Sequence, residues 1–133
     1  MKKILLATCL FIIVTCSKKE ELNKTFIGNL PIVSATSPTA TVARQKIISN
    51  VRCELSSLSG SVYFQGFEIT ETSQHHFNIS ANALYKNWNT QIGMPVIWTM
   101  DTTVSINTTI SGAYILNFYN AAVLLKSDTV AVN

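Results

Sequence analysis

Apolar residues recur at every second position along several stretches of this chain, and this period constrains the fold more than any other feature. In "HFNISANALY" (76–85) the apolar positions alternate without a break, and in "SGAYILNFYN" (111–120) they alternate over Tyr114, Leu116 and Phe118. Side chains of a β-strand point alternately to opposite faces, so this period predicts strands with one buried face. No window repeats apolar residues at helical spacing with caps at both ends. The sequence therefore predicts an all-β sandwich or barrel with almost no helix.

Turn residues divide the chain into short runs that are rich in β-branched and aromatic residues. Gly66 interrupts the alternation of one run, which predicts a β-bulge there. Pro31 and Pro38 flank "IVSATS", which we expect to be an edge segment because proline cannot donate to a strand ladder. The expected strands are 45–55, 61–72, 76–85, 94–100 with 102–110 as one bent strand or two, 111–120 and 121–133.

The first two of these runs predict which side chains enter the core. In the first run strict alternation fails only where Ser49 intervenes. In the second run the alternation slips at Gly66. We expect inward side chains at Ile47, Val51, Cys53 and Leu55, and at Val62, Phe64, Phe67 and Ile69.

The N-terminus carries a short apolar run that ends at a cysteine. Lys2 and Lys3 precede an uncharged run of 11 residues, Ile4–Val14. A membrane-spanning helix needs about 20 apolar residues, so this run has the length of a secretory signal instead. Its end, "IVTC", resembles the lipobox of bacterial lipoproteins. That resemblance implies a signal peptide over 1–15 and a mature chain that begins at a diacylglyceryl-modified, acylated Cys16, anchored through chains such as palmitate. The alternative is an ordinary signal peptide with a chance cysteine.

Charged residues follow the cysteine at once, in "SKKEE". Lys19-Glu20-Glu21 resembles the surface-export signal of Bacteroidota lipoproteins, a basic residue followed by two acids. The resemblance implies an outer-membrane lipoprotein on the cell surface, with residues 16–29 as lipidated cysteine and tether. The alternative is that these charges form a solvated spacer without a signal.

The chain from Thr41 onward has no net charge, although the whole sequence of 133 residues has a formal net charge of +3. From Thr41 onward the basic residues Arg44, Lys46, Arg52, Lys86 and Lys126 balance the acidic residues Glu54, Glu68, Glu71, Asp101 and Asp128. No basic cluster remains that could meet phosphates, so we expect no nucleic-acid partner. Residues 30–133 suffice for one domain of ordinary size.

Residues 30–133 resemble the immunoglobulin-like domains of bacterial surface proteins. The resemblance is carried by "SGAYILNFY", a short turn and "SDTVAVN", where Gly112 and Tyr114 before an alternating strand resemble a tyrosine corner. It implies a single immunoglobulin-like β-sandwich of about seven strands. In antibody domains a disulfide cysteine lies two residues after that tyrosine, but here the residue is Leu116. Cys53 then has no disulfide partner, and we expect it to be a small buried hydrophobe.

Residues with catalytic or metal-binding chemistry are scarce. His75 and His76 are adjacent, and Glu68 and Glu71 lie near them in sequence. A zinc site needs about four ligands, and adjacent strand residues point to opposite faces, so a polar turn is the simpler interpretation. The chain has no nucleophile elbow, P-loop, dinucleotide fingerprint or H-E-x-x-H motif. We therefore expect no enzyme activity, no metal and no cofactor.

Two sets of residues are candidate binding or modification sites. In "YKNWNTQIG" the aromatic Tyr85 and Trp88 lie beside Asn87 and Asn89, a combination that suits a sugar because rings cover its apolar face and amides meet its hydroxyls. The alternative is that Trp88 caps one end of the sandwich. Asp101-Thr102-Thr103 and Asp128-Thr129-Val130 resemble the Asp-Thr-x acceptor of Bacteroidota O-glycosylation, which implies Thr102 and Thr129 as acceptors. The alternative is that both pairs simply begin strands.

These patterns together predict a lipid-anchored cell-envelope protein whose immunoglobulin-like domain acts as a binding or spacer module. The alternative is a glycan-binding accessory lipoprotein. The expected partners are the membrane, through lipid on Cys16, and a glycan or another envelope protein.

The first test concerns Cys16. Mass spectrometry of the mature protein should find an acylated cysteine at its N-terminus, because only a thiol at this position can form the thioether. Cys16→Ala should leave the precursor uncut or release the protein from the membrane, whereas Cys9→Ala should be processed normally. A mature chain that starts elsewhere and carries no lipid would contradict the prediction.

Overall fold

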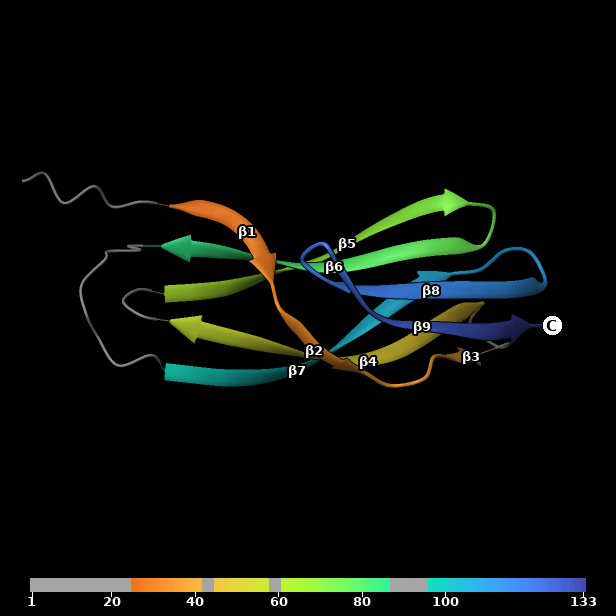
Figure 1. The fold of residues 1–133 in the computed structure, drawn as a ribbon. Coiled ribbons are helices and arrows are strands. Elements are labelled where there is room, and N and C mark those ends of the chain that lie inside the picture. The colour runs from red at the N-terminus through yellow and green to blue at the C-terminus, as the bar shows by residue number, and fades with distance from the viewer. Residues whose placement is uncertain (1–24, 42–44, 58–60, 87–95) are drawn as a thin grey trace, which may run out of the picture.

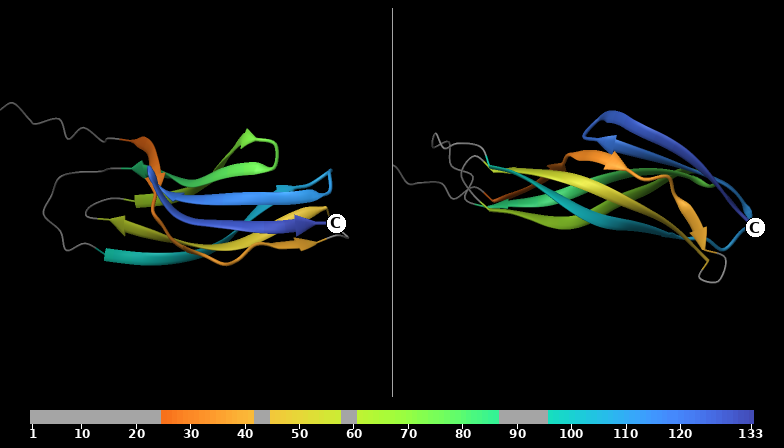
Figure 2. Two further views of the ribbon diagram at one scale, coloured as in Figure 1. Left: turned by 45° about the vertical axis from the view of Figure 1, so that its right-hand side comes forward. Right: turned by 90° about the horizontal axis from the view of Figure 1, so that it is seen from below.

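The computed structural model describes residues 25–41, 45–57, 61–86 and 96–133. These residues form nine β-strands and no helix, so no helix in the described part could cross a membrane. The strands build an elongated molecule, in which the first strand starts near one end and the C-terminus lies at the other (Figures 1 and 2). They are β1 (Phe26–Leu30), β2 (Ile32–Ala35), β3 (Thr39–Thr41), β4 (Lys46–Ser57), β5 (Ser61–Ser73), β6 (His76–Lys86), β7 (Val96–Asn107), β8 (Gly112–Asn120) and β9 (Val123–Val132).

The strands form two sheets that pack together. In sheet A, β6 is central: β5 pairs with it along one edge, while β1 and β8 share the other edge, and β9 pairs with β8. In sheet B, β4 is central: β7 pairs with one edge, while β2 and β3 share the other. The predicted all-β architecture of two packed sheets is therefore confirmed.

The chain crosses from sheet A to sheet B at Pro31. β1 pairs with β6 in sheet A, and β2 pairs with β4 in sheet B. Proline has no N–H to leave unpaired at such a crossing, and the carbonyl of Pro31 accepts a hydrogen bond of 2.9 Å from the backbone N of Glu54. The segment between the two prolines contains the edge strand β2, as the sequence predicted.

Alternation along the strands fills the core. Tyr114, Leu116 and Phe118 on β8 are buried, as are Ile79, Ala81 and Ala83 on β6. Ser49, which interrupts the apolar alternation of its run, still lies on the inward face: it is fully buried and its hydroxyl donates to the carbonyl of Thr36 at 2.7 Å. The buried hydrophobic residues are Leu30, Ile32, Ile47, Val51, Cys53, Ile79, Ala81, Ala83, Val104, Ile106, Tyr114, Leu116 and Phe118.

The bulge predicted at Gly66 is present. The pairing of β5 with β6 shifts between Phe64 and Gly66, and Gly66 has a φ of 121°, which side chains rarely allow. The shift lets Phe64 and Phe67 both pack against the core, with ring centroids 5.3 Å apart and edge to face. Ile69 was expected to point into the core but stays 39% exposed, because β5 is exposed from Glu68 to Ser73 at the edge of the sheet.

The structure also decides one open alternative and corrects two expectations. For the stretch expected as one bent strand or two, the described residues form a single strand, β7, which runs unbroken over 96–107. The described strands number nine rather than about seven, because the chain before β4 contributes three short strands. The sheet begins at Phe26, inside the segment 16–29 expected as tether, since the ring of Phe26 stacks on Tyr85 with centroids 4.9 Å apart.

Lys126 joins the two sheets at one open side. Lys126 lies on the edge strand β9 of sheet A. Its Nζ donates to the carbonyl of Ala35 at 3.0 Å and to the Ser37 hydroxyl at 3.4 Å. Ala35 is the last residue of β2, and Ser37 lies between β2 and β3 of sheet B. Asp128 lies 2.7 Å from the same ammonium. An inward charge of this kind also prevents an edge strand from pairing with another chain.

Cys53 provides a test of this register. Its side chain is fully buried, and burial raises the pKa of its thiol from 9.0 to about 11. Because the folded-state pKa lies above the unfolded one, the neutral thiol stabilises the fold below about pH 9, and this contribution is lost as the pH rises toward 11. We expect no reaction with thiol reagents in the native protein and full reaction after denaturation.

Two substitutions at Cys53 separate the effect of a buried hydroxyl from the effect of losing the thiol. Cys53→Ser should lower the free energy of unfolding by about 1–3 kcal/mol, because it buries a hydroxyl without a partner. Cys53→Ala, which adds no polar group, is the matched control. Rapid labelling of native protein would show that the strand register is wrong by one residue.

Candidate functional site

Most residues that the sequence singled out at the N-terminus and in the long loop lie outside the described residues. These are Cys16, Lys19, Glu20, Glu21, Asn87, Trp88 and Asn89. Tyr85 is described and half-buried, and its hydroxyl donates to the carbonyl of Asn29 at 2.9 Å. With its ring stacked on Phe26, Tyr85 fixes β1 to β6. Burial raises the pKa of its hydroxyl.

The two threonines proposed as glycosylation acceptors have different surroundings. Thr102 lies on β7 opposite the buried Val51, so it is on the face turned toward the core and is half-buried. Thr129 lies on β9 opposite Ile115 and is exposed. Of the two hydroxyls, that of Thr129 is the more accessible to a modifying enzyme.

His75 has a packing role in the described structure. It occupies the turn between β5 and β6 with a φ of 65°, and its ring stacks on Tyr114 with centroids 4.2 Å apart. A Cβ on Gly112 would lie 2.8 Å from this ring, so only glycine fits beneath it. No group of three or more potential metal ligands occurs within the described ranges.

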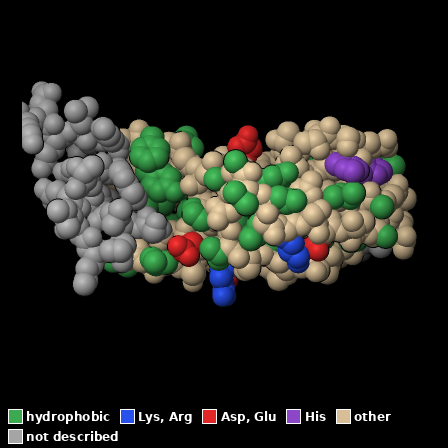
Figure 3. All heavy atoms as spheres, viewed as in Figure 1, with side chains coloured by type: hydrophobic (Ala, Val, Ile, Leu, Met, Phe, Trp, Pro, Cys, Tyr) green, Lys and Arg blue, Asp and Glu red, His purple; other side chains and the backbone are tan. Residues whose placement is uncertain are grey.

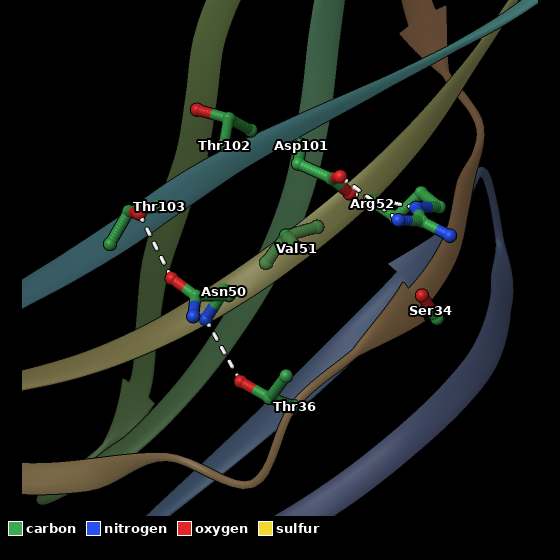
Figure 4. Close-up of a pocket in the computed structure, with 8 residues that line it drawn as sticks. All are labelled: Ser34, Thr36, Asn50, Val51, Arg52, Asp101, Thr102 and Thr103. Atoms are coloured by element: carbon green, nitrogen blue, oxygen red, sulfur yellow. Dashed lines mark hydrogen bonds and ion pairs between the residues drawn. The ribbon is translucent and has the colours of Figure 1, made fainter.

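A polar groove that the sequence did not reveal lies on the outer face of sheet B. It has a volume of about 500 Å³ and crosses β2, β4 and β7 (Figure 4). The register places Asn50 opposite Thr103 and Arg52 opposite Asp101, both on the face turned away from the core. Its lining residues are Ser34, Thr36, Asn50, Arg52, Asp101 and Thr103, together with Val51 and Thr102, whose side chains are turned to the other face of the sheet.

Arg52 and Asp101 form a two-pronged ion pair at one side of the groove. The Arg52 Nε donates to the Asp101 Oδ1 at 2.7 Å, and its Nη2 donates to Oδ2 at 2.9 Å. The hydrogen bond from Arg52 lowers the pKa of Asp101, and the hydrogen bond to Asp101 raises the pKa of Arg52. The pair is exposed, so it orders two planar polar groups in the groove more than it stabilises the fold.

Asn50 is held between two hydroxyl side chains. The Thr103 Oγ1 donates to the Asn50 Oδ1 at 3.1 Å, while the backbone N of Asn50 donates to the Thr36 Oγ1 at 3.0 Å. Among the described residues, the Nδ2 of Asn50 donates to no other group, so its two hydrogens are available to a ligand (Figure 4). The groove thus presents amide, hydroxyl, guanidinium and carboxylate groups in fixed positions.

Charges elsewhere on the molecule are sparse. On the face shown in Figure 3, Lys and Arg side chains lie singly or beside an acidic group rather than in a patch. That face shows no clustered basic footprint of the kind that nucleic-acid-binding proteins carry. We take the ordered polar groups of the groove as the candidate site.

Arg52→Gln tests the pairing in the groove. We expect the pKa of Asp101, followed by NMR titration of its carboxyl, to rise toward its ordinary value because its main hydrogen-bond donor is gone. Because the pKa of Asp101 is lower in the folded than in the unfolded protein, the ion pair stabilises the fold at pH values above the ordinary carboxyl pKa. This stabilisation is lost as the pH falls through the folded-state pKa. Lys46→Gln, on the same strand, should leave the Asp101 titration unchanged. An unaltered Asp101 pKa in Arg52→Gln would contradict the ion pair.

Comparisons of the chain with protein-family models, with curated proteins and with solved structures gave no match. Its function is therefore inferred from its own residues.

Proposed function

We propose that this protein is a lipid-anchored binding module of the cell envelope. The apolar run that ends at Cys16 supports the anchor, and Lys19-Glu20-Glu21 supports a position on the outer surface of the outer membrane. The observation that carries the binding role is the polar groove of sheet B, whose side chains are fixed on paired strands. A site on rigid strands loses little entropy when it binds a ligand.

The domain is, in this proposal, a variant of the immunoglobulin-like sandwich. The Tyr114 hydroxyl donates to the carbonyl of Ile110 at 2.8 Å, the bond that a tyrosine corner makes to the upstream backbone. Leu116 and Cys53, which stand where antibody domains have their disulfide, are both fully buried. The parallel pairing of β6 with β8 departs from the antiparallel sheets of that fold. The proposed relation therefore concerns the two-layer architecture and not each strand connection.

A glycan is the ligand class that the groove fits best. Adjacent sugar hydroxyls both donate and accept, and the groove offers acceptors on Asp101 beside donors on Arg52 and Asn50. Its volume of about 500 Å³ lies in the range of ligand sites, yet its side chains are mainly polar. A ligand covered with hydroxyls satisfies such groups better than an apolar molecule does.

The experiment measures retention of the purified protein on a glycan array that includes bacterial envelope polysaccharides. Asn50→Ala and Thr103→Ala should each weaken binding roughly fivefold, since each removes a hydrogen bond worth about 1 kcal/mol. Asn107→Ala is the matched control, because Asn107 lies on the outward face of β7 beyond the groove. The melting temperature of all three variants should stay close to that of the wild type.

Two results would overturn this proposal. If no glycan is retained, the spacer role replaces the binding role. If Asn50→Ala and Thr103→Ala bind as tightly as Asn107→Ala, the ligand lies elsewhere and the groove is not the site.

A further inference from the structure

We propose that the outer edge of β7 pairs with β7 of a second copy of this chain. The two strands run antiparallel across a two-fold axis and join the two B sheets into one. Among the described residues, β4 is the one strand that pairs with β7, and no backbone hydrogen bond reaches its other edge. Unpaired N–H and C=O groups along a sheet edge form a template for another strand.

Three other sheet edges of the described structure carry features that oppose such pairing. On β9, Lys126 points inward and binds sheet B. The edge opposite β7 consists of the short strands β2 and β3, with Pro31 and Pro38 beside them. β5 has a bulge at Gly66 and a second register shift between Glu71 and Ser73. Short strands, prolines, bulges and inward charges are the known means of blocking an edge.

β7 carries none of these features. It is 12 residues long, and it pairs with β4 through all of them without a bulge. It contains no proline, lysine or glycine. Its single charged residue, Asp101, already accepts two hydrogen bonds from the guanidinium of Arg52. The edge is thus long, regular and nearly neutral.

Its charge pattern favours a second copy as the occupant. Two β7 strands can approach without repulsion because Arg52 balances the charge of Asp101 in each copy. Two β5 strands would instead bring Glu68 and Glu71 of both copies together. Like charges opposite each other destabilise a strand pair.

One register makes β7 complementary to itself. With Thr103 opposite Thr103 on the two-fold axis, Asp101 lies opposite Ser105 and Thr99 opposite Asn107, so the outward face pairs polar groups with polar groups. On the inward face, Met100 meets Ile106 and Thr102 meets Val104. Threonine pairs and apolar or β-branched pairs of this kind stabilise antiparallel strands. Both Met100 and Thr102 are half-buried in the single copy.

The same register brings an exposed aromatic ring of β7 against the other copy. Val96, Ile97 and Trp98 at the start of β7 are 51%, 60% and 64% exposed. Because β7 ends at Asn107, the ladder centred on Thr103 covers residues 99–107, and Trp98 directly beyond it lies diagonal to Ile106 of the other copy, a distance within reach of an aromatic ring. Part of the Trp98 ring is thereby removed from water.

The pairing has a consequence that depends on the proposed function. Asp101 and Thr103 line the groove from β7, so a joined sheet brings two grooves side by side across the axis. Two sites on one rigid face bind a repeating polymer with higher avidity than one site does. A polysaccharide would therefore be held more strongly than its isolated repeating unit.

The test uses a disulfide across the axis in the purified full-length protein. Thr103→Cys should form a covalent dimer on mild oxidation, since directly opposed residues have Cβ atoms only about 5 Å apart. Thr70→Cys, on the exposed edge strand β5, is the matched control and should stay monomeric. Monomeric Thr103→Cys in folded protein, with Cys53 still protected, would overturn the proposal, as would equal cross-linking of Thr70→Cys.

Charge exchange tests the register itself. Sedimentation should show that Thr103→Lys and Thr103→Glu are each monomeric, because like charges meet on the axis, and that their mixture forms dimers. Dimers in each separate variant, or none in the mixture, would overturn the register. Both measurements contain no glycan, so they can fail while the groove still binds, and the glycan array can fail while the strands still pair.

Discussion

The twelve-residue ladder between β4 and β7 determines most of what is distinctive in this molecule. Its register sets Cys53 and Val51 toward the core and sets Asn50 and Arg52 toward the groove. A slip of one residue would exchange the two faces, exposing Cys53 and burying Arg52. The core therefore enforces the geometry of the groove, since a buried guanidinium without a partner costs more than the ladder could supply. The same strand also presents its second edge to solvent.

Side-chain contacts at the margins of the sheets supplement the core. Tyr114 donates to the backbone of Ile110 just before β8 begins, and within sheet A His75 stacks on the same ring from the turn between β5 and β6. At the other side, Lys126 reaches the carbonyl of Ala35. The side where β5 and β7 run has no such bond among the described residues. Additional strands can approach there without displacing an existing contact.

Local sequence predicted the strands well but not their partners. Two-residue alternation located β6 and β8 closely, the break at Gly66 located a bulge, and Cys53 was placed inside. Alternation depends on neighbours within one strand, so it contains no information on which strands pair, and the parallel contact of β6 with β8 could not be foreseen. The groove was missed for the same reason. Arg52 and Asp101 are 49 residues apart, and nothing in either segment alone indicates the other.

The proposed lipid anchor and the proposed strand pair together imply an orientation of the molecule on a membrane. A two-fold axis perpendicular to the joined sheet sends the two N-termini to opposite ends of the pair, because the paired strands are antiparallel. If both copies carry the proposed lipid on Cys16, the two lipids can enter one bilayer only when this axis is normal to it, so that the sheets lie flat on the surface. Ten residues from Cys16 to Phe26 can span at most about 35 Å, more than the spacing of about 10 Å between packed sheets. β1, which follows the tether, belongs to sheet A. In this proposed arrangement sheet A faces the lipid, so that the groove of sheet B would face away from the membrane in both copies and be open to an extracellular polymer.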